Sequence, residues 1–177
     1  MGKPKSNIDF LLMSFIFKLR DFFLPRVHIL EEAGIRPGFH VLDYGCGPGG
    51  YIIPLAELVG KSGRIYALDI HQPAVQTVQR LAFKKCLPNI ETIHSDCKTG
   101  LSGESIDVIL LYDTFHDLND PEGVLKELHR VLKSNGILSF TDHHLKENEI
   151  MSRVTSSRLF RLSAKGGRTY SFSKEEP

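Results

Sequence analysis

The sequence predicts a doubly wound α/β fold, in which helices cover both faces of a mostly parallel sheet, and three observations support this class. Short apolar runs typical of strands alternate with amphipathic helical segments along the chain, a pattern that favours βαβ units. A glycine-rich turn follows the first of these runs, at the edge where such sheets bind ligands. Near the end of the chain, Lys165-Gly166-Gly167 separates two short runs and predicts a hairpin. The hairpin places at least one antiparallel strand in the sheet.

The chain has the length and composition of one globular domain, with 177 residues of which 41% are hydrophobic and 24% charged. We expect a single domain over residues 1–177, with N-terminal helices in 1–35 and the α/β core in 36–177. The formal net charge of +1 provides no overall field that would attract nucleic acid or a membrane. The three cysteines have no C-x-x-C spacing, so a disulfide framework is disfavoured and a reducing cytoplasm is expected.

Residues 1–35 predict two helices. The first, over residues 7–23, is apolar around most of its circumference, and such a helix needs a second apolar partner. We expect it to close over the strand ends as a lid, and its other face could support a homodimer or contact a lipid-like acceptor. The second helix runs from Pro25 to Ala33 and stops at Gly34. The uncharged run in the first helix has eight residues, too few for a membrane span of about 20 residues.

The later elements follow from strand-like runs and helical periodicity. The predicted strands are "HVLDYG", "GRIYALDI", "NIETIHSD", "IDVILLYD" and "ILSFTDHH", then "LFRLSA" and "RTYSFS" on either side of the hairpin turn. The predicted helices are "GYIIPLAELVG", which Pro54 is expected to kink, residues 72–85, "EGVLKELHRVLK" after the start signal Asp120-Pro121-Glu122, and residues 147–158. Strands and helices therefore alternate through most of the chain.

The turn "VLDYGCGPGG", residues 41–50, contains two overlapping patterns. One is G-x-G-x-x-G, the fingerprint that cradles a dinucleotide pyrophosphate. The other is an acid followed by G-x-G-x-G. Pro48 has no N–H to offer an anion, and the carboxylate of Asp43 would repel phosphate. The turn therefore suits a ligand with positive charge and no phosphate, and S-adenosylmethionine, with its sulfonium and ammonium groups, fits.

Acidic residues also follow the second and third strands. Asp69 ends the second strand and could accept hydrogen bonds from both ribose hydroxyls of a cofactor. Ser95-Asp96-Cys97 ends the third strand. Taken singly, Asp69 and Asp96 could be solvated acids in turns. Because they follow strands in the same order as the glycine turn does, a shared binding edge is favoured.

Five segments together resemble the class I S-adenosylmethionine-dependent methyltransferases, over about residues 25–174: "VLDYGCGPGG", "IYALDI", "HSDC", "IDVILLYDTFHDL" and "VLKELHRVLKSNGIL". The resemblance implies a Rossmann-like sheet with strand order 3-2-1-4-5-7-6 and S-adenosylmethionine as cofactor. With Asp43 near the ammonium group, the expected cofactor-binding residues are Asp43, Gly45, Cys46, Gly47, Gly49, Asp69, Ile70, Asp96, Cys97 and Tyr112. In the family, the glycine turn contacts the methionine part, the acid after the second strand binds ribose and the acid after the third binds adenine. "YDTFHDL" lacks the N-P-P-Y of nucleic-acid amino methylation and resembles the small-molecule branch.

Histidines gather at the predicted carboxyl ends of strands two to five: His71, His94, His116, His143 and His144. They could form a polar active site or a metal site, although strand-end loops are often polar without either role. No ligand spacing requires a metal, and we predict none. His116 and the pair His143-His144 come from adjacent strands and could converge. We expect His116 to be the catalytic base, because the acceptor pocket should open off the fourth strand.

These observations predict an S-adenosylmethionine-dependent methyltransferase that acts on a small molecule, with nucleic acid disfavoured as acceptor. Three alternatives are a nicotinamide-dependent oxidoreductase, disfavoured by Pro48 and Asp43, an aminopropyl-transferring relative, and a non-catalytic binding protein. A basic segment in residues 150–174 is best interpreted as a solvated face. The alternative interpretation is a contact surface for an anionic substrate, RNA or a membrane. Its basic residues are Arg153, Arg158, Arg161, Lys165, Arg168 and Lys174.

Overall fold

A computed structural model describes residues 27–175, and the helix expected over residues 7–23 lies outside this part of the chain. The described residues form a seven-stranded sheet in the order β3-β2-β1-β4-β5-β7-β6, as predicted. The strands are β1 (His40–Tyr44), β2 (Arg64–Asp69), β3 (Ile90–His94), β4 (Ile106–Tyr112), β5 (Leu132–Thr141), β6 (Phe160–Lys165) and β7 (Tyr170–Lys174). Strands β1 to β5 pair in parallel, whereas β7 is antiparallel to both β5 and β6.

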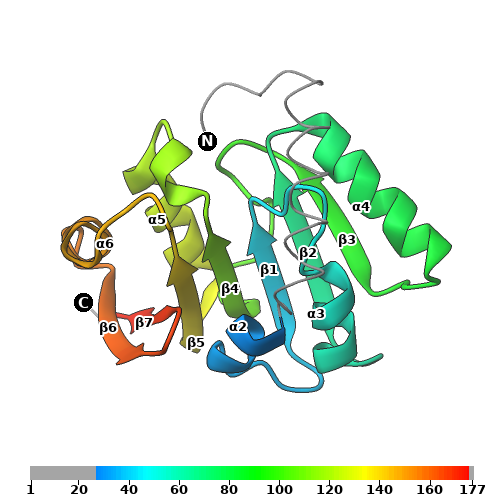
Figure 1. The fold of residues 1–177 in the computed structure, drawn as a ribbon, viewed down its shortest axis with the longest axis horizontal. Helices are drawn as coiled ribbons and strands as arrows, with labels where there is room; N and C mark the ends of the chain where they lie inside the picture. Colours follow the sequence, from blue (N-terminus) through cyan, green and yellow to red (C-terminus); the bar gives the residue numbers. More distant parts are fainter. Residues whose placement is uncertain (1–26, 176–177) are drawn as a thin grey trace.

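Helices cover both faces of this sheet (Figure 1). They are α2 (Val27–Glu32), α3 (Ile52–Val59), α4 (Gln72–Lys84), α5 (Pro121–Val131) and α6 (Glu147–Thr155), with a short 3-10 turn, η1 (Phe115–Asp117), after β4. Alternate strand residues enter opposite halves of the core: Val41 packs with α2 and α3, whereas Leu42 packs with α5 and α6. The doubly wound class predicted from the sequence is therefore confirmed.

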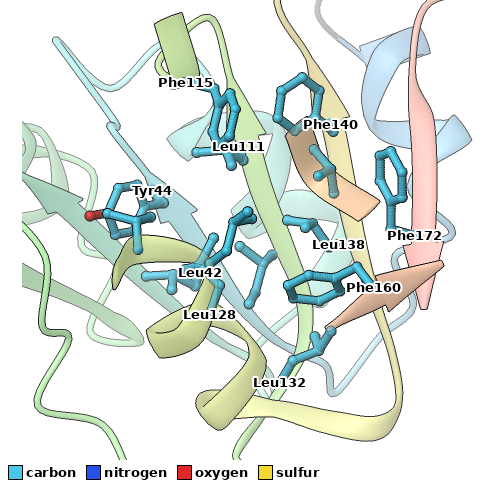
Figure 2. Packing of buried hydrophobic residues seen from close by; sticks show 14 of the residues in the cluster. Leu42, Tyr44, Leu111, Phe115, Leu128, Leu132, Leu138, Phe140, Phe160 and Phe172 are labelled. Atoms are coloured by element: carbon cyan, nitrogen blue, oxygen red, sulfur yellow. The ribbon is translucent and has the colours of Figure 1, made fainter. Parts of the chain in front are cut away.

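The half of the core beneath α5 is rich in aromatic side chains (Figure 2). Phe140 packs edge-on against both Phe115 and Phe172, with ring centroids 5.3 and 6.2 Å away. Phe115 belongs to η1, so this packing anchors the turn that follows β4. The turn carries His116, whose backbone position is thus set by the core.

Several element boundaries differ from the prediction, and two of these differences have a physical explanation. Helix α3 begins at Ile52, so Pro54 lies in its first turn, where N–H groups have no partner within the helix. The proline therefore breaks no helical hydrogen bond, and the expected kink has no cause. Helix α5 ends at Val131, and Leu132 already pairs with Ile106 of β4. The prediction that this helix continues to Lys133 was wrong.

The closing hairpin is tied to the start of the described chain by Glu32 of α2. Its carboxylate accepts hydrogen bonds from the backbone N–H groups of Arg168 and Thr169, at 3.1 and 2.9 Å, and from the Thr169 hydroxyl at 2.8 Å. Burial works to raise the pKa of Glu32, but these bonds outweigh it and hold the pKa below its usual value. The predicted hairpin is confirmed, and a charged side chain 136 positions earlier than Arg168 secures its turn.

Candidate cofactor and acceptor site

The glycine turn after β1 has three glycines in two kinds of surroundings. Gly45, Gly47 and Gly49 have φ angles of +84°, +50° and +83°, a left-handed region that favours glycine. A Cβ on Gly45 would collide with the side chain of Thr114, and a Cβ on Gly49 would stand 2.9 Å from Val78. A Cβ on Gly47 would meet no atom within 4 Å. The backbone at Gly47 therefore faces open space, where a ligand can approach it closely.

Asp69 at the end of β2 holds this turn in place. One carboxylate oxygen accepts the N–H of Gly47 and the other accepts the N–H of His71, both at 2.8 Å. The N–H groups of Gly45 and Cys46 donate to a carbonyl oxygen of β2. Burial raises the pKa of Asp69, and its backbone hydrogen bonds act in the opposite direction. Each carboxylate oxygen can accept more than one hydrogen bond, so Asp69 can hold the turn and also bind ligand hydroxyls.

The neighbouring strand ends supply the other predicted cofactor residues. Asp43 is buried in β1, whereas the side chain of Asp96 is exposed after β3. The buried hydroxyl of Tyr44 donates to the carbonyl oxygen of Asp96 at 3.2 Å and so fixes the Asp96 segment beside β1. Ile70 and Cys97 are partly buried against the core. The predicted binding residues of β1, β2 and β3 therefore lie along one edge of the sheet.

The Cys46 thiol and the Tyr112 ring of this edge are held in the core. Burial raises the pKa of the Cys46 thiol well above its usual value, so it stays protonated. Tyr112 is 6% exposed, its hydroxyl lies 2.7 Å from the Ser139 hydroxyl, and its ring packs edge-on against Tyr51 at 5.3 Å. At the binding edge Tyr112 offers its carbonyl oxygen, which accepts a hydrogen bond from the Thr114 hydroxyl.

Three histidines converge at the ends of β4 and β5, as the sequence suggested. The ring centroid of His144 lies 4.1 Å from that of His116 and 3.9 Å from that of His143. His71 and His94 lie apart from this group on the β2 and β3 side, where the His94 ring contacts the carbonyl oxygen of Ile70. Within residues 27–175, no group of three or more metal-ligating side chains is arranged to hold a metal ion.

Two carboxylates that were not predicted as site residues hold the histidine group. Asp142 lies 2.9 Å from the Nδ1 atom of His116, and Asp113 lies 2.6 Å from that of His143. Asp142 directly precedes the His143-His144 pair in "TDHH", so an acid at the end of a strand was the available signal. Its pairing with a histidine from the turn after the neighbouring strand appears only in the fold.

A family model described as a methyltransferase domain matches residues 35–170. The demethylmenaquinone methyltransferase of Geobacillus stearothermophilus is 29% identical over 113 residues, which cover 63% of this chain and 48% of that protein. A ubiquinone/menaquinone biosynthesis C-methyltransferase from a Shewanella species is 26% identical over 142 residues, covering 79% of this chain and 57% of that protein. The chain thus spans about half the length of the curated relatives it matches.

Solved structures share the fold. A S-adenosylmethionine-dependent methyltransferase from Aquifex aeolicus superimposes with a TM-score of 0.75 at 24% identity, covering 90% of this chain and 97% of that one. A putative S-adenosylmethionine-dependent methyltransferase from Methanococcus maripaludis gives 0.77 at 13% identity, covering 100% and 98%.

The chain therefore belongs to the methyltransferase domain family. The methyltransferase family predicted from the sequence is confirmed, and solved S-adenosylmethionine-dependent methyltransferases share its fold. No helix in the described part of the chain has the length and apolar character that a membrane span requires.

Proposed function

We propose that this chain transfers the methyl group of S-adenosylmethionine to a small-molecule acceptor that binds beside His116. The contact between Gly45 and Thr114 carries the proposal. It joins the glycine turn to the segment that bears His116, two residues beyond Thr114, so that the cofactor edge and the histidine group are adjacent. When bound, the cofactor supplies a methyl group on a sulfonium, already activated for displacement.

The residues of the cofactor edge fit this group. The open backbone at Gly47 allows close approach, and Asp69 has acceptor capacity for ribose hydroxyls. Asp96 is exposed and is assigned to the adenine amino group, and Ile70 is assigned to the adenine ring. Asp43 is assigned to the ammonium group. Carboxylates at the ends of three adjacent strands suit a cationic ligand and oppose the pyrophosphate of a nicotinamide cofactor.

The protein's main contribution to methyl transfer is positioning. Holding two reactants in a productive geometry can lower a barrier by roughly 7–11 kcal/mol in favourable cases. The edge formed by β1, β4 and β5 can bring the acceptor next to the glycine turn. A general base at His116 would add roughly 10²–10⁴-fold where the acceptor must lose a proton.

The acceptor class draws support from the curated relatives, since one is named a demethylmenaquinone methyltransferase and another a ubiquinone/menaquinone biosynthesis C-methyltransferase. A quinol-type ring is therefore the first acceptor class to test, and nucleic acid stays outside the proposal. A cytoplasmic location, a homodimer and a lid formed by residues 7–23 stay predictions.

Two substitutions separate the halves of the site. Asp69→Ala removes the ribose acceptor and the support of Gly47, so the affinity for S-adenosylhomocysteine should fall at least tenfold, about 1.4 kcal/mol. His116→Ala should keep that affinity and lower turnover. Calorimetry gives the first quantity, and transfer of a labelled methyl group to a panel of quinols gives the second.

Asp107→Asn is a matched control, because Asp107 lies at the amino end of β4, where its carboxylate pairs with Lys133. Unchanged affinity in a folded Asp69→Ala protein would refute the cofactor assignment. A His116→Ala protein that loses cofactor affinity but turns over normally at saturation would reverse the assigned roles.

A further inference from the structure

Asp142 is a buried carboxylate that orients the ring of His116. Its side chain is 0% exposed at the end of β5. It accepts the backbone N–H groups of His116 and His144, both at 3.0 Å, and lies 2.9 Å from the Nδ1 atom of His116. An ionised carboxylate can only accept hydrogen bonds. When Asp142 is ionised, the hydrogen between the two side chains therefore belongs to Nδ1 of His116.

This hydrogen bond decides what the other ring nitrogen can do. A neutral imidazole with its hydrogen on Nδ1 carries a lone pair on Nε2. The tilted contact with His144, at a centroid distance of 4.1 Å, packs against the same ring and helps to hold its orientation. The His116 side chain is 20% exposed, so it is reachable from solvent as well as held by the fold.

The surroundings also suit the ring after it has gained a proton. The Nε2 atom lies 3.6 Å from a carboxylate oxygen of Asp117. This separation is too long for a hydrogen bond and within the range of an ion pair. An imidazolium at His116 would lie between Asp142 and Asp117, whose negative charges stabilise it.

We infer that Asp142 is a positioning residue that makes Nε2 of His116 a proton acceptor, and that the methyl acceptor is a neutral phenol or enol whose hydroxyl is ionised there. The inference rests on the proposed function and specifies its substrate class. A phenol has a pKa of about 10, whereas a thiol, at about 8.5, ionises more readily without a base. An imidazole base suits a hydroxyl that is acidic enough to yield its proton and not yet ionised.

The step balances within the acceptor and His116. The O–H bond of the acceptor breaks, and its proton forms an N–H bond at Nε2. The acceptor keeps the electron pair, and its nucleophilic oxygen or ring carbon bonds to the methyl carbon as the bond from that carbon to sulfur breaks, with its pair left on sulfur. Where a ring carbon is methylated, that carbon then loses its proton to water, and the electron pair of the broken C–H bond restores the aromatic ring. His116 then returns its proton to water.

A purely structural role for Asp142 makes a different prediction. The two backbone N–H groups that it accepts already join η1 to the turn after β5, and such a tie does not depend on which nitrogen of His116 carries the hydrogen. The tautomer of His116 therefore distinguishes a positioning residue from a structural tie.

The test compares the full chain with its Asp142→Asn variant by nitrogen-15 NMR of the histidine rings, with S-adenosylhomocysteine present. His116→Gln identifies the signals of His116. We expect the native ring in the Nδ1–H form. The asparagine side chain in this variant has one acceptor oxygen and one NH₂ donor in place of two acceptor oxygens. An NH₂ donor facing Nδ1 needs a lone pair there, so Asp142→Asn should shift the ring toward the Nε2–H tautomer. A native His116 ring in the Nε2–H form, or a tautomer that the variant leaves unchanged, would overturn the inference without any acceptor being known.

Activity provides the second readout, with para-cresol and para-nitrophenol as acceptors. Asp142→Asn should slow turnover of para-cresol by about a hundredfold or more, and should affect para-nitrophenol little in mildly alkaline buffer, where that phenol is already ionised. Asp107→Asn should leave the tautomer and both rates near the native values. An equal loss of turnover with both phenols indicates a structural role for Asp142 and overturns the inference. If neither phenol reacts with the native protein, the NMR measurement of the His116 tautomer decides. If the native chain does not bind S-adenosylhomocysteine, the proposed function is refuted.

Discussion

Gly45 and Gly47 share a left-handed backbone but have opposite surroundings. Gly45→Ala combines an unfavourable φ with a clash against Thr114, so we expect unfolding free energy to fall by about 1–3 kcal/mol. Gly47→Ala meets no protein atom and should cost about 1 kcal/mol. Its methyl group would occupy the open side of the turn, so cofactor affinity should fall at least tenfold.

Urea unfolding and calorimetry with S-adenosylhomocysteine measure the two effects. Adding Thr114→Ala to Gly45→Ala removes most of the atoms in the way and should restore part of the lost stability. If Gly45→Ala and Gly47→Ala lose the same unfolding free energy and bind S-adenosylhomocysteine with the same affinity, the turn does not open toward the cofactor.

The placement of single candidate residues was predictable where it follows from their position along the chain. Asp69 and Asp96 end strands, and parallel strands bring their carboxyl ends to one edge. Asp142 was missed, because its partner His116 lies 26 positions away and the pairing depends on the register of β4 and β5. Tyr112 shows the same limit, since its place at the end of a strand did not reveal that its ring turns into the core.

At the scale of elements, Glu127 fixes the link between β3 and β4 onto α5. Its carboxylate accepts the N–H and hydroxyl of Thr99, at 2.8 and 2.6 Å, and pairs with Arg130. Hydrogen bonding to Arg130 is the largest cause that lowers the pKa of Glu127, to about 2. A depressed folded-state pKa means that the stabilisation is present above the ordinary value of 4.5 and is lost as the pH falls toward about 2.

We therefore expect Glu127→Gln to lower the unfolding free energy by about 1–3 kcal/mol at neutral pH. The difference in unfolding free energy between the native protein and the variant should narrow as the pH falls from 4.5 toward about 2. Urea unfolding at several pH values measures this difference. Glu147→Gln is the control, because the Glu147–Lys165 pair is about half exposed and such pairs contribute little. A gap that stays constant over this pH range would contradict the electrostatic explanation.

The α5–β5 boundary shows why element ends were harder to predict than element types. The run "VLKELHRVLK" has helical periodicity through Lys133, yet the chain leaves the helix after Val131. Pairing of Leu132 with β4 and a 2.6 Å ion pair between Lys133 and Asp107 favour the strand. Tertiary contacts of this kind override local preference and leave little trace in the sequence.

At the scale of the whole molecule, the alternation of strands and helices predicted the fold class, and the hairpin predicted its antiparallel end. The strand order came from the family resemblance, since periodicity does not say which strands are neighbours. The order β3-β2-β1-β4-β5 sets the ends of β1, β2 and β3 beside those of β4 and β5. The residues proposed to bind the cofactor and the acceptor thereby share one edge of the sheet.

The central claim is that this edge binds S-adenosylmethionine through the glycine turn and Asp69. Calorimetric titration of the full chain with S-adenosylhomocysteine and, separately, with NAD tests it most directly. We expect saturable binding of S-adenosylhomocysteine at one site per chain and no heat of binding with NAD. Saturable binding of NAD, with none of S-adenosylhomocysteine, would contradict the claim.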